Sequence, residues 1–208
     1  MASARHNLVL IVDFGAQTSQ LIARRVRESG VYCEIHRPEP LTRERLEELA
    51  PKAIIFSGGP KSVYDPGAPT IGKHVFELGV PILGICYGVQ LMAHLLGGAV
   101  ERADRREFGA AMVEVERSSG IFDRFDVGQS LEVWMSHGDR IIAVPPGFVT
   151  LAKNPSTPAC AIGNPERRIY GVQFHPEVTH TPDGAEMIAA FLFDVAGIDA
   201  DWTPASFV

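Results

Sequence analysis

A cysteine stands between two glycines in the segment Gly84-Ile85-Cys86-Tyr87-Gly88, directly after the apolar run 81–85. This G-x-C-x-G pattern is the cysteine version of the strand-to-helix turn that lifts a nucleophile off an α/β sheet. The glycines relieve crowding when the central residue adopts strained backbone angles. A helix N-terminus also favours a thiolate over a thiol. We therefore predict that Cys86 is a nucleophile, with a small buried structural cysteine as the alternative.

A thiolate that attacks an amide needs N–H donors for the developing oxyanion. The backbone N–H of Tyr87 directly follows the predicted nucleophile. Gly58 and Gly59 follow another apolar run, and glycine lets backbone donors approach a substrate closely. We predict an oxyanion hole at Gly59 and Tyr87, although Gly58-Gly59-Pro60 taken alone also fits an ordinary turn.

One of the seven histidines, His175, has the setting of a catalytic base. A predicted strand over 168–174 runs into His175-Pro176-Glu177, and Pro176 ends strand pairing because it has no N–H. In extended backbone, residues two apart point the same way, so Glu177 can orient the imidazole and stabilise its cation. A surface His–Glu pair is the alternative.

A second polar cluster, Ser136-His137-Gly138, follows the predicted strand 130–134. Its hydroxyl, imidazole and backbone groups could bind a polar substrate, and we assign it that role. A capped turn is the alternative interpretation.

The elements that must position these groups alternate between strand and helix. Buried strands are predicted over 7–13, 31–36, 52–57 and 81–85, with helices over 17–29, 41–49, 70–78 and 87–96. This order predicts an α/β fold with an open, mostly parallel central sheet flanked by helices. Shorter strands over 112–116, 130–134, 148–153, 159–162 and 168–174 predict a smaller antiparallel or mixed sheet, followed by a helix over 184–196. We expect a domain over 1–198. Residues 199–208 are expected to begin a linker, with nothing to bury Trp202 and Phe207.

Composition excludes several classes of function. The net charge of −6 argues against a nucleic-acid partner and against an anionic membrane surface. Three widely spaced cysteines predict no disulfide framework and a reducing, cytoplasmic location. No segment has the length of a signal peptide core or a membrane span. Without HxxxH, HxH or CxxC spacings we expect no metal, and no phosphate-loop motif is present.

Three segments together resemble the class I (triad) glutamine amidotransferases: Ser57-Gly58-Gly59-Pro60, Gly84–Gln90 and Phe174-His175-Pro176-Glu177. The resemblance implies a Cys86, His175 and Glu177 triad that hydrolyses L-glutamine to glutamate and ammonia through a γ-glutamyl thioester. It implies no cofactor for this domain. It also implies a glutamine pocket, which would be lined by Gly58, Gly59, Gln90, Ser136, His137 and Gly138.

Four longer segments, 11–17, 59–64, 134–139 and 173–181, are similar to one branch of this family. In that branch the amidotransferase domain precedes an ATP-pyrophosphatase (synthetase) domain, which binds ATP and Mg²⁺ and receives the ammonia. The resemblance therefore implies an excised domain, with a homodimer only in the full-length enzyme. Two alternatives stay open: a cysteine hydrolase of γ-glutamyl or peptide substrates, and a catalytically quiet regulatory module.

Overall fold

The computed structural model describes residues 7–203, and within them every side chain except those of 104–106. The strands are β1 (Val9–Val12), β2 (Cys33–His36), β3 (Ala53–Phe56), β4 (Ile82–Ile85), β5 (Ala99–Val115), β6 (Ser130–Ala143), β7 (Val149–Lys153), β8 (Ala161–Asn164) and β9 (Ile169–Val172). The α-helices are α1 (Ser19–Glu28), α2 (Arg43–Leu49), α3 (Tyr87–Leu95) and α4 (Gly184–Ala190). Short 3₁₀ helices span Lys73–Glu77 and Gly120–Phe122, and a π-helical turn spans Phe191–Val195.

All nine strands belong to one sheet in the order β2-β1-β3-β4-β9-β8-β7-β5-β6. The first five strands in this order are parallel, and the remaining pairs are antiparallel. The α/β class and the parallel first half agree with the sequence-based expectation. The expected separate, smaller sheet is wrong, because β9 pairs with β4 on one side and with β8 on the other and so joins the two halves.

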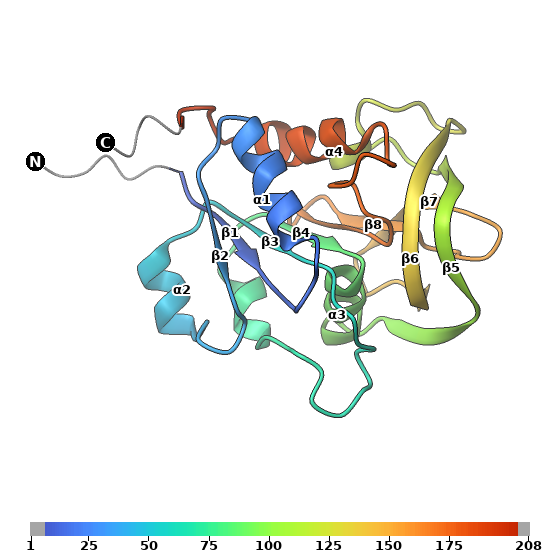
Figure 1. Ribbon diagram of the computed structural model, residues 1–208, viewed down its shortest axis with the longest axis horizontal. Helices are drawn as coiled ribbons and strands as arrows, with labels where there is room; N and C mark the ends of the chain where they lie inside the picture. The colour runs from blue at the N-terminus through green and yellow to red at the C-terminus, as the bar shows by residue number, and fades with distance from the viewer. Residues whose placement is uncertain (1–6, 204–208) are drawn as a thin grey trace, which may run out of the picture.

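Two hydrophobic clusters cover the two faces of the parallel strands. In β1, Val9 and Ile11 enter one cluster, while Leu10 and Val12 enter the other. Both faces are buried because helices lie on both sides of the sheet: α1 and α4 on one, α2 and α3 on the other (Figure 1). This is why the parallel strands are apolar without interruption.

The register of the parallel strands brings their carboxyl ends to one edge. Val12 pairs with Phe56, Phe56 with Gly84, and Ile85 with Val172. The residues that follow these strands, among them Ser57, Cys86 and Gln173, therefore lie at the same edge. In open α/β sheets this is the edge at which ligands bind.

The antiparallel half is dominated by the long β5–β6 hairpin, which curves past the end of the parallel strands (Figure 1). The sequence predicted only 112–116 and 130–134 as strand. It placed the polar cluster Ser136-His137-Gly138 after a strand. That placement is wrong, because β6 continues to Ala143, and Glu107 of β5 pairs with His137.

Two smaller expectations also change. The helix expected over 70–78 is a five-residue 3₁₀ helix. Trp202 is only 8% exposed, packs on the Tyr32 ring at a centroid distance of 6.2 Å, and donates its backbone N–H to Gly30 O. The expectation that nothing buries Trp202 is therefore wrong, while Phe207 lies outside the described residues. Within 7–203, no helix is long and apolar enough to cross a bilayer.

Candidate active site

Cys86 occupies the strained turn that its flanking glycines predicted. Its backbone has φ 51° and ψ −109°, and residues other than glycine rarely adopt a positive φ. A Cβ on Gly84 would lie 2.8 Å from Val89 N, and one on Gly88 would lie 2.6 Å from Phe56 O. Only glycine fits at these two positions, so the elbow between β4 and α3 is confirmed as a local structure.

His175 and Glu177 lie beside this elbow. His175 Nδ1 is 2.8 Å from Glu177 Oε1, and the Glu177 side chain is fully buried. The sequence-based prediction that extended backbone brings the two side chains together is wrong. Strand β9 ends at Val172, and Pro176-Glu177 form a turn. The His175 backbone N–H donates to Trp134 O, and Thr181 Oγ1 donates to His175 O. The first bond ties the loop to β6, and the second joins two residues within the loop.

The imidazole of His175 lies between Cys86 and the Glu177 carboxylate. Burial alone lowers the pKa of His175. Hydrogen bonds to Cys86 and Glu177 and the charges of both groups outweigh burial and raise the pKa to about 10. An imidazolium between a thiolate and a carboxylate is the electrostatic arrangement of an activated cysteine nucleophile.

The glycine loop after β3 lies beside Cys86, His175 and Tyr87. A Cβ on Gly58 would lie 3.3 Å from His175 Cε1 and 3.7 Å from Cys86 Cβ. A Cβ on Gly59 would lie 3.1 Å from Cγ of the Tyr87 ring. The glycine loop after β3 thus packs directly on the elbow and the histidine.

Two cavities meet at Cys86. One, of about 340 Å³, is lined by Cys86 and by five predicted pocket residues: Gly59, Gln90, Ser136, His137 and Gly138. The other, of about 370 Å³, contains Cys86, His175 and the sixth predicted residue, Gly58. The loops on either side of the site also contribute, through Lys61 and Ser62 to the first cavity and through Val178 to the second. Cys86, His175 and the six residues predicted for the pocket therefore all line one or both of these cavities.

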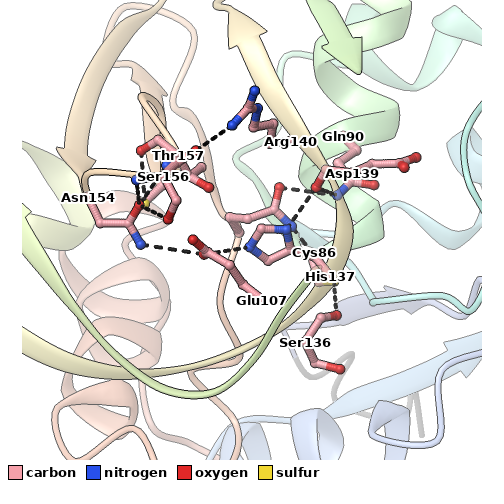
Figure 2. A network of polar contacts seen from close by, with 12 residues as sticks. Cys86, Gln90, Glu107, Ser136, His137, Asp139, Arg140, Asn154, Ser156 and Thr157 are labelled. Carbon is pink, nitrogen blue, oxygen red and sulfur yellow. Dashed lines mark hydrogen bonds and ion pairs between the residues drawn. The ribbon is translucent and has the colours of Figure 1, made fainter. Parts of the chain in front are cut away.

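Gln90 and His137 take part in the wall of the pocket in a way that the sequence did not indicate. Gln90 Nε2 donates to Asp139 O at 2.8 Å, and His137 Nδ1 lies 2.9 Å from the same oxygen. His137 Nε2 lies 3.2 Å from Glu107 Oε2 (Figure 2). Burial lowers the pKa of His137, and the Glu107 carboxylate opposes this without reversing it.

Three residues of the site were missed. Gln173 is fully buried, with Nε2 at 3.9 Å from Cys86 Sγ. Arg25 donates to Glu177 O from α1, and Glu107 reaches His137 from β5. Gln173 could have been found from the sequence, because it is a polar residue two positions before the predicted catalytic base His175. Arg25 and Glu107 could not, because tertiary packing alone brings them to the site. Among the described side chains, no group of three His, Cys, Asp or Glu residues could hold a metal ion.

A cysteine on a strained strand-to-helix turn, beside a histidine held by a buried carboxylate, is the arrangement of a triad-type cysteine hydrolase on an α/β sheet. The sequence matches the family described as Glutamine amidotransferase class-I over residues 10–195. The chain belongs to this class I glutamine amidotransferase family.

Curated relatives are close in sequence and longer. The chain is 50% identical over 201 residues to a glutamine-hydrolysing GMP synthase of Natranaerobius thermophilus, covering 97% of this chain and 39% of that protein. It is 53% identical over 200 residues to a glutamine-hydrolysing GMP synthase of Clostridium novyi, covering 96% and 38%. The chain thus spans about two fifths of the length of these relatives.

Two solved structures share the fold of this chain. A Thermoplasma acidophilum protein described as one subunit of a GMP synthase superposes with a TM-score of 0.83 at 30% identity, covering 93% of this chain and 95% of that chain. A glutamine amidotransferase of Thermotoga maritima has a TM-score of 0.76 at 20% identity, covering 92% and 99%, and supports the fold alone.

Proposed function

We propose that this chain hydrolyses the side-chain amide of L-glutamine, with Cys86 as nucleophile, His175 as acid and base, and Glu177 as the group that orients His175. The observation that carries the proposal is the position of His175, which lies beside Cys86 and whose Nδ1 is 2.8 Å from Glu177 Oε1. Class I family membership supplies the amide of glutamine as the bond that is broken.

The chemistry has two halves. The Cys86 sulfur attacks the amide carbon of glutamine, and backbone N–H groups of Gly59 and Tyr87 stabilise the oxyanion. His175 gives its proton to the leaving nitrogen, so that ammonia departs and a γ-glutamyl thioester forms. His175 then accepts a proton from water as the water attacks the thioester, and glutamate leaves with the Cys86 sulfur restored.

The pocket wall suits a small polar substrate. In the proposal, Ser136, His137 and Gly138 on β6, with Gly58, Gly59 and Gln90, hold the amino-acid end of glutamine while its amide reaches Cys86. The first cavity, of about 340 Å³, has the size expected for a small ligand.

The relatives suggest a destination for the ammonia. Because they are named as GMP synthases, we propose that it is used to convert XMP to GMP on a synthetase domain of the ATP-pyrophosphatase type. ATP and Mg²⁺ would bind there, not to this chain, and dimerisation would belong to the full-length enzyme. Residues 199–208 would lead toward that domain. A cytoplasmic location is part of the same proposal, and it is supported by the free state of Cys33, Cys86 and Cys160.

The test is ammonia release from glutamine by the chain alone and with the synthetase domain added. We expect slow release alone and faster release with the partner. Cys86→Ala should lower turnover by at least about 10³-fold, the usual cost of losing a nucleophile. Cys33→Ala is the matched control, because Cys33 Sγ faces Ala23 O away from the site, and its turnover should stay near wild type. Retained turnover in Cys86→Ala would refute the assignment.

The substrate is tested separately. A γ-glutamyl peptide turned over faster than glutamine would favour the peptide or γ-glutamyl hydrolase. A second experiment treats the chain with a glutamine-analogue electrophile in the presence of the synthetase domain. Failure of this reagent to modify Cys86 would favour a catalytically quiet regulatory module.

A further inference from the structure

Two buried amide side chains, those of Gln90 and Gln173, connect β6 to Cys86 through consecutive hydrogen bonds. The donor and the acceptor in each of these bonds can be assigned in turn. The series begins at Asp139 O in β6, a carbonyl that can only accept hydrogen bonds. Gln90 Nε2 lies 2.8 Å from this oxygen, so the amide nitrogen of Gln90 must face β6. His137 Nδ1, at 2.9 Å, faces the same oxygen (Figure 2).

The orientation of Gln90 then fixes that of Gln173. Gln90 Nε2 also lies 3.1 Å from Gln173 Oε1, so the Gln173 oxygen is turned toward Gln90. An amide group carries its oxygen and its NH₂ on opposite sides, so the Gln173 NH₂ must point the other way. It points at Cys86 Sγ, which is 3.9 Å from Gln173 Nε2.

The other contacts of the Cys86 sulfur indicate what this N–H can do. Cys86 Sγ lies 3.5 Å from Ser136 O, a contact that suits a thiol as donor but places a carbonyl oxygen against a thiolate (Figure 2). Donors on other sides must offset that repulsion when the sulfur is negative. His175 lies beside the sulfur, and Gln173 supplies a side-chain amide N–H at 3.9 Å.

We propose that Gln173 stabilises the thiolate of Cys86 through an N–H···S hydrogen bond, and that Gln90 and Asp139 O act as positioning groups that hold its amide in the donating orientation. Gln173 is fully buried, and Gln90 is 3% exposed, so water does not compete for these contacts. The inference rests on Cys86 being the nucleophile of the proposed function.

The experiment measures the pH midpoint for alkylation of Cys86 by iodoacetamide, read by peptide mass spectrometry. It uses no glutamine, so its outcome is independent of whether glutamine is the substrate. Burial raises the pKa of Cys33 to about 11 and raises that of Cys160 further, so these thiols stay unreactive where Cys86 is expected to react.

Gln173→Leu removes the donor, and we expect its Cys86 midpoint to rise. Gln173→Glu keeps an acceptor for Gln90 but turns an anionic oxygen toward the sulfur. Its midpoint should rise further, by about one pH unit or more. Gln129→Glu is the matched control, because it makes the same charge change at an exposed position where Gln129 Oε1 accepts only a local backbone N–H.

Thermal unfolding by circular dichroism establishes that each variant is folded. If Gln173→Glu does not fold, Gln173→Leu alone decides the matter. A Gln173→Leu midpoint equal to that of wild type overturns the proposal. A midpoint that rises equally in Gln129→Glu and Gln173→Glu also overturns it, because the effect would then be one of net charge.

Discussion

Replacing Glu177 by Gln isolates the charge that holds the proton on His175. The substitution keeps the shape of the side chain and an oxygen that can accept from Nδ1 at 2.8 Å, but removes the negative charge. The Glu177 side chain is fully buried, so water cannot replace that charge. The variant therefore changes the electrostatics of the imidazole with little change in packing.

The magnitude follows from the geometry. A nitrogen–oxygen contact of 2.8 Å places the centres of the two charges roughly 4 Å apart. With an effective dielectric constant of about 20, that pair is worth about 4 kcal/mol. At 1.36 kcal/mol for each pH unit, this corresponds to a fall of about 3 in the pKa of His175. The starting value is about 10, so the group should change from charged to partly neutral near pH 7.

The assay is a pH titration of ¹⁵N-histidine-labelled protein by NMR, in wild type and in Glu177→Gln. Glu34→Gln is the control, because it breaks a His–Glu contact of the same 2.8 Å length, with His36, at a partly exposed site. It should leave the His175 titration unchanged. If Glu177→Gln also leaves the His175 titration unchanged, the carboxylate does not hold the proton and the electrostatic reasoning fails.

Three further changes test the fold and its pH dependence. Gly88→Ala should destabilise the domain by about 2 kcal/mol or more, since its Cβ would lie 2.6 Å from Phe56 O; an unchanged melting temperature would contradict the packing. Trp202→Ala should cost about 3 kcal/mol in urea unfolding if the tail is part of the domain; no cost would restore the linker interpretation. The folded pKa of His175, about 10, lies above the usual 6.5, so its stabilisation is complete below pH 6.5 and is lost as the pH rises through 10. The free energy of unfolding should fall across that window, and less so in His175→Asn.

The parallel half of the fold was predictable from sequence because its strands are short, apolar and buried on both faces. In β1 every residue belongs to one of the two clusters, so the run shows no polar interruption. The elbow was predictable for a different reason. A positive φ at Cys86 and close approaches at Gly84 and Gly88 leave glycine as the only fitting neighbour, and glycine is visible in a sequence.

The antiparallel half was predicted less well because polar residues occupy inward positions. In β6 the buried positions alternate from Leu131 through Val133 and Met135 to Ile141, with His137 and Asp139 between them. A pattern that counts only apolar residues stops at Met135. His137 bonds within the site, and the backbone oxygen of Asp139 accepts from Gln90, so the prediction cut the strand short at the place where it enters the pocket.

Those same polar residues support a last prediction, which concerns the proton between His137 and Glu107. His137 faces an oxygen from each ring nitrogen: Asp139 O at 2.9 Å from Nδ1 and Glu107 Oε2 at 3.2 Å from Nε2. A neutral imidazole has one N–H, so it can satisfy only one of them. Burial lowers the pKa of His137 and so favours this neutral form.

Glu107→Gln supplies an NH₂ that can donate to Nε2 while Nδ1 donates to Asp139 O, so both contacts of a neutral His137 are satisfied, at the loss of the long 3.4 Å bond that Asn154 Nδ2 donates to Glu107 Oε2. We expect this variant to keep or gain stability, by up to about 1 kcal/mol in urea unfolding at pH 7. Glu107→Ala leaves the buried Nε2 without that neighbour and should cost about 1–3 kcal/mol. NMR of the labelled ring should show a proton on Nδ1 alone in Glu107→Gln. Equal destabilisation by both variants would contradict this prediction. It would mean that His137 is an imidazolium stabilised by the Glu107 charge, because Glu107→Gln and Glu107→Ala both remove that charge.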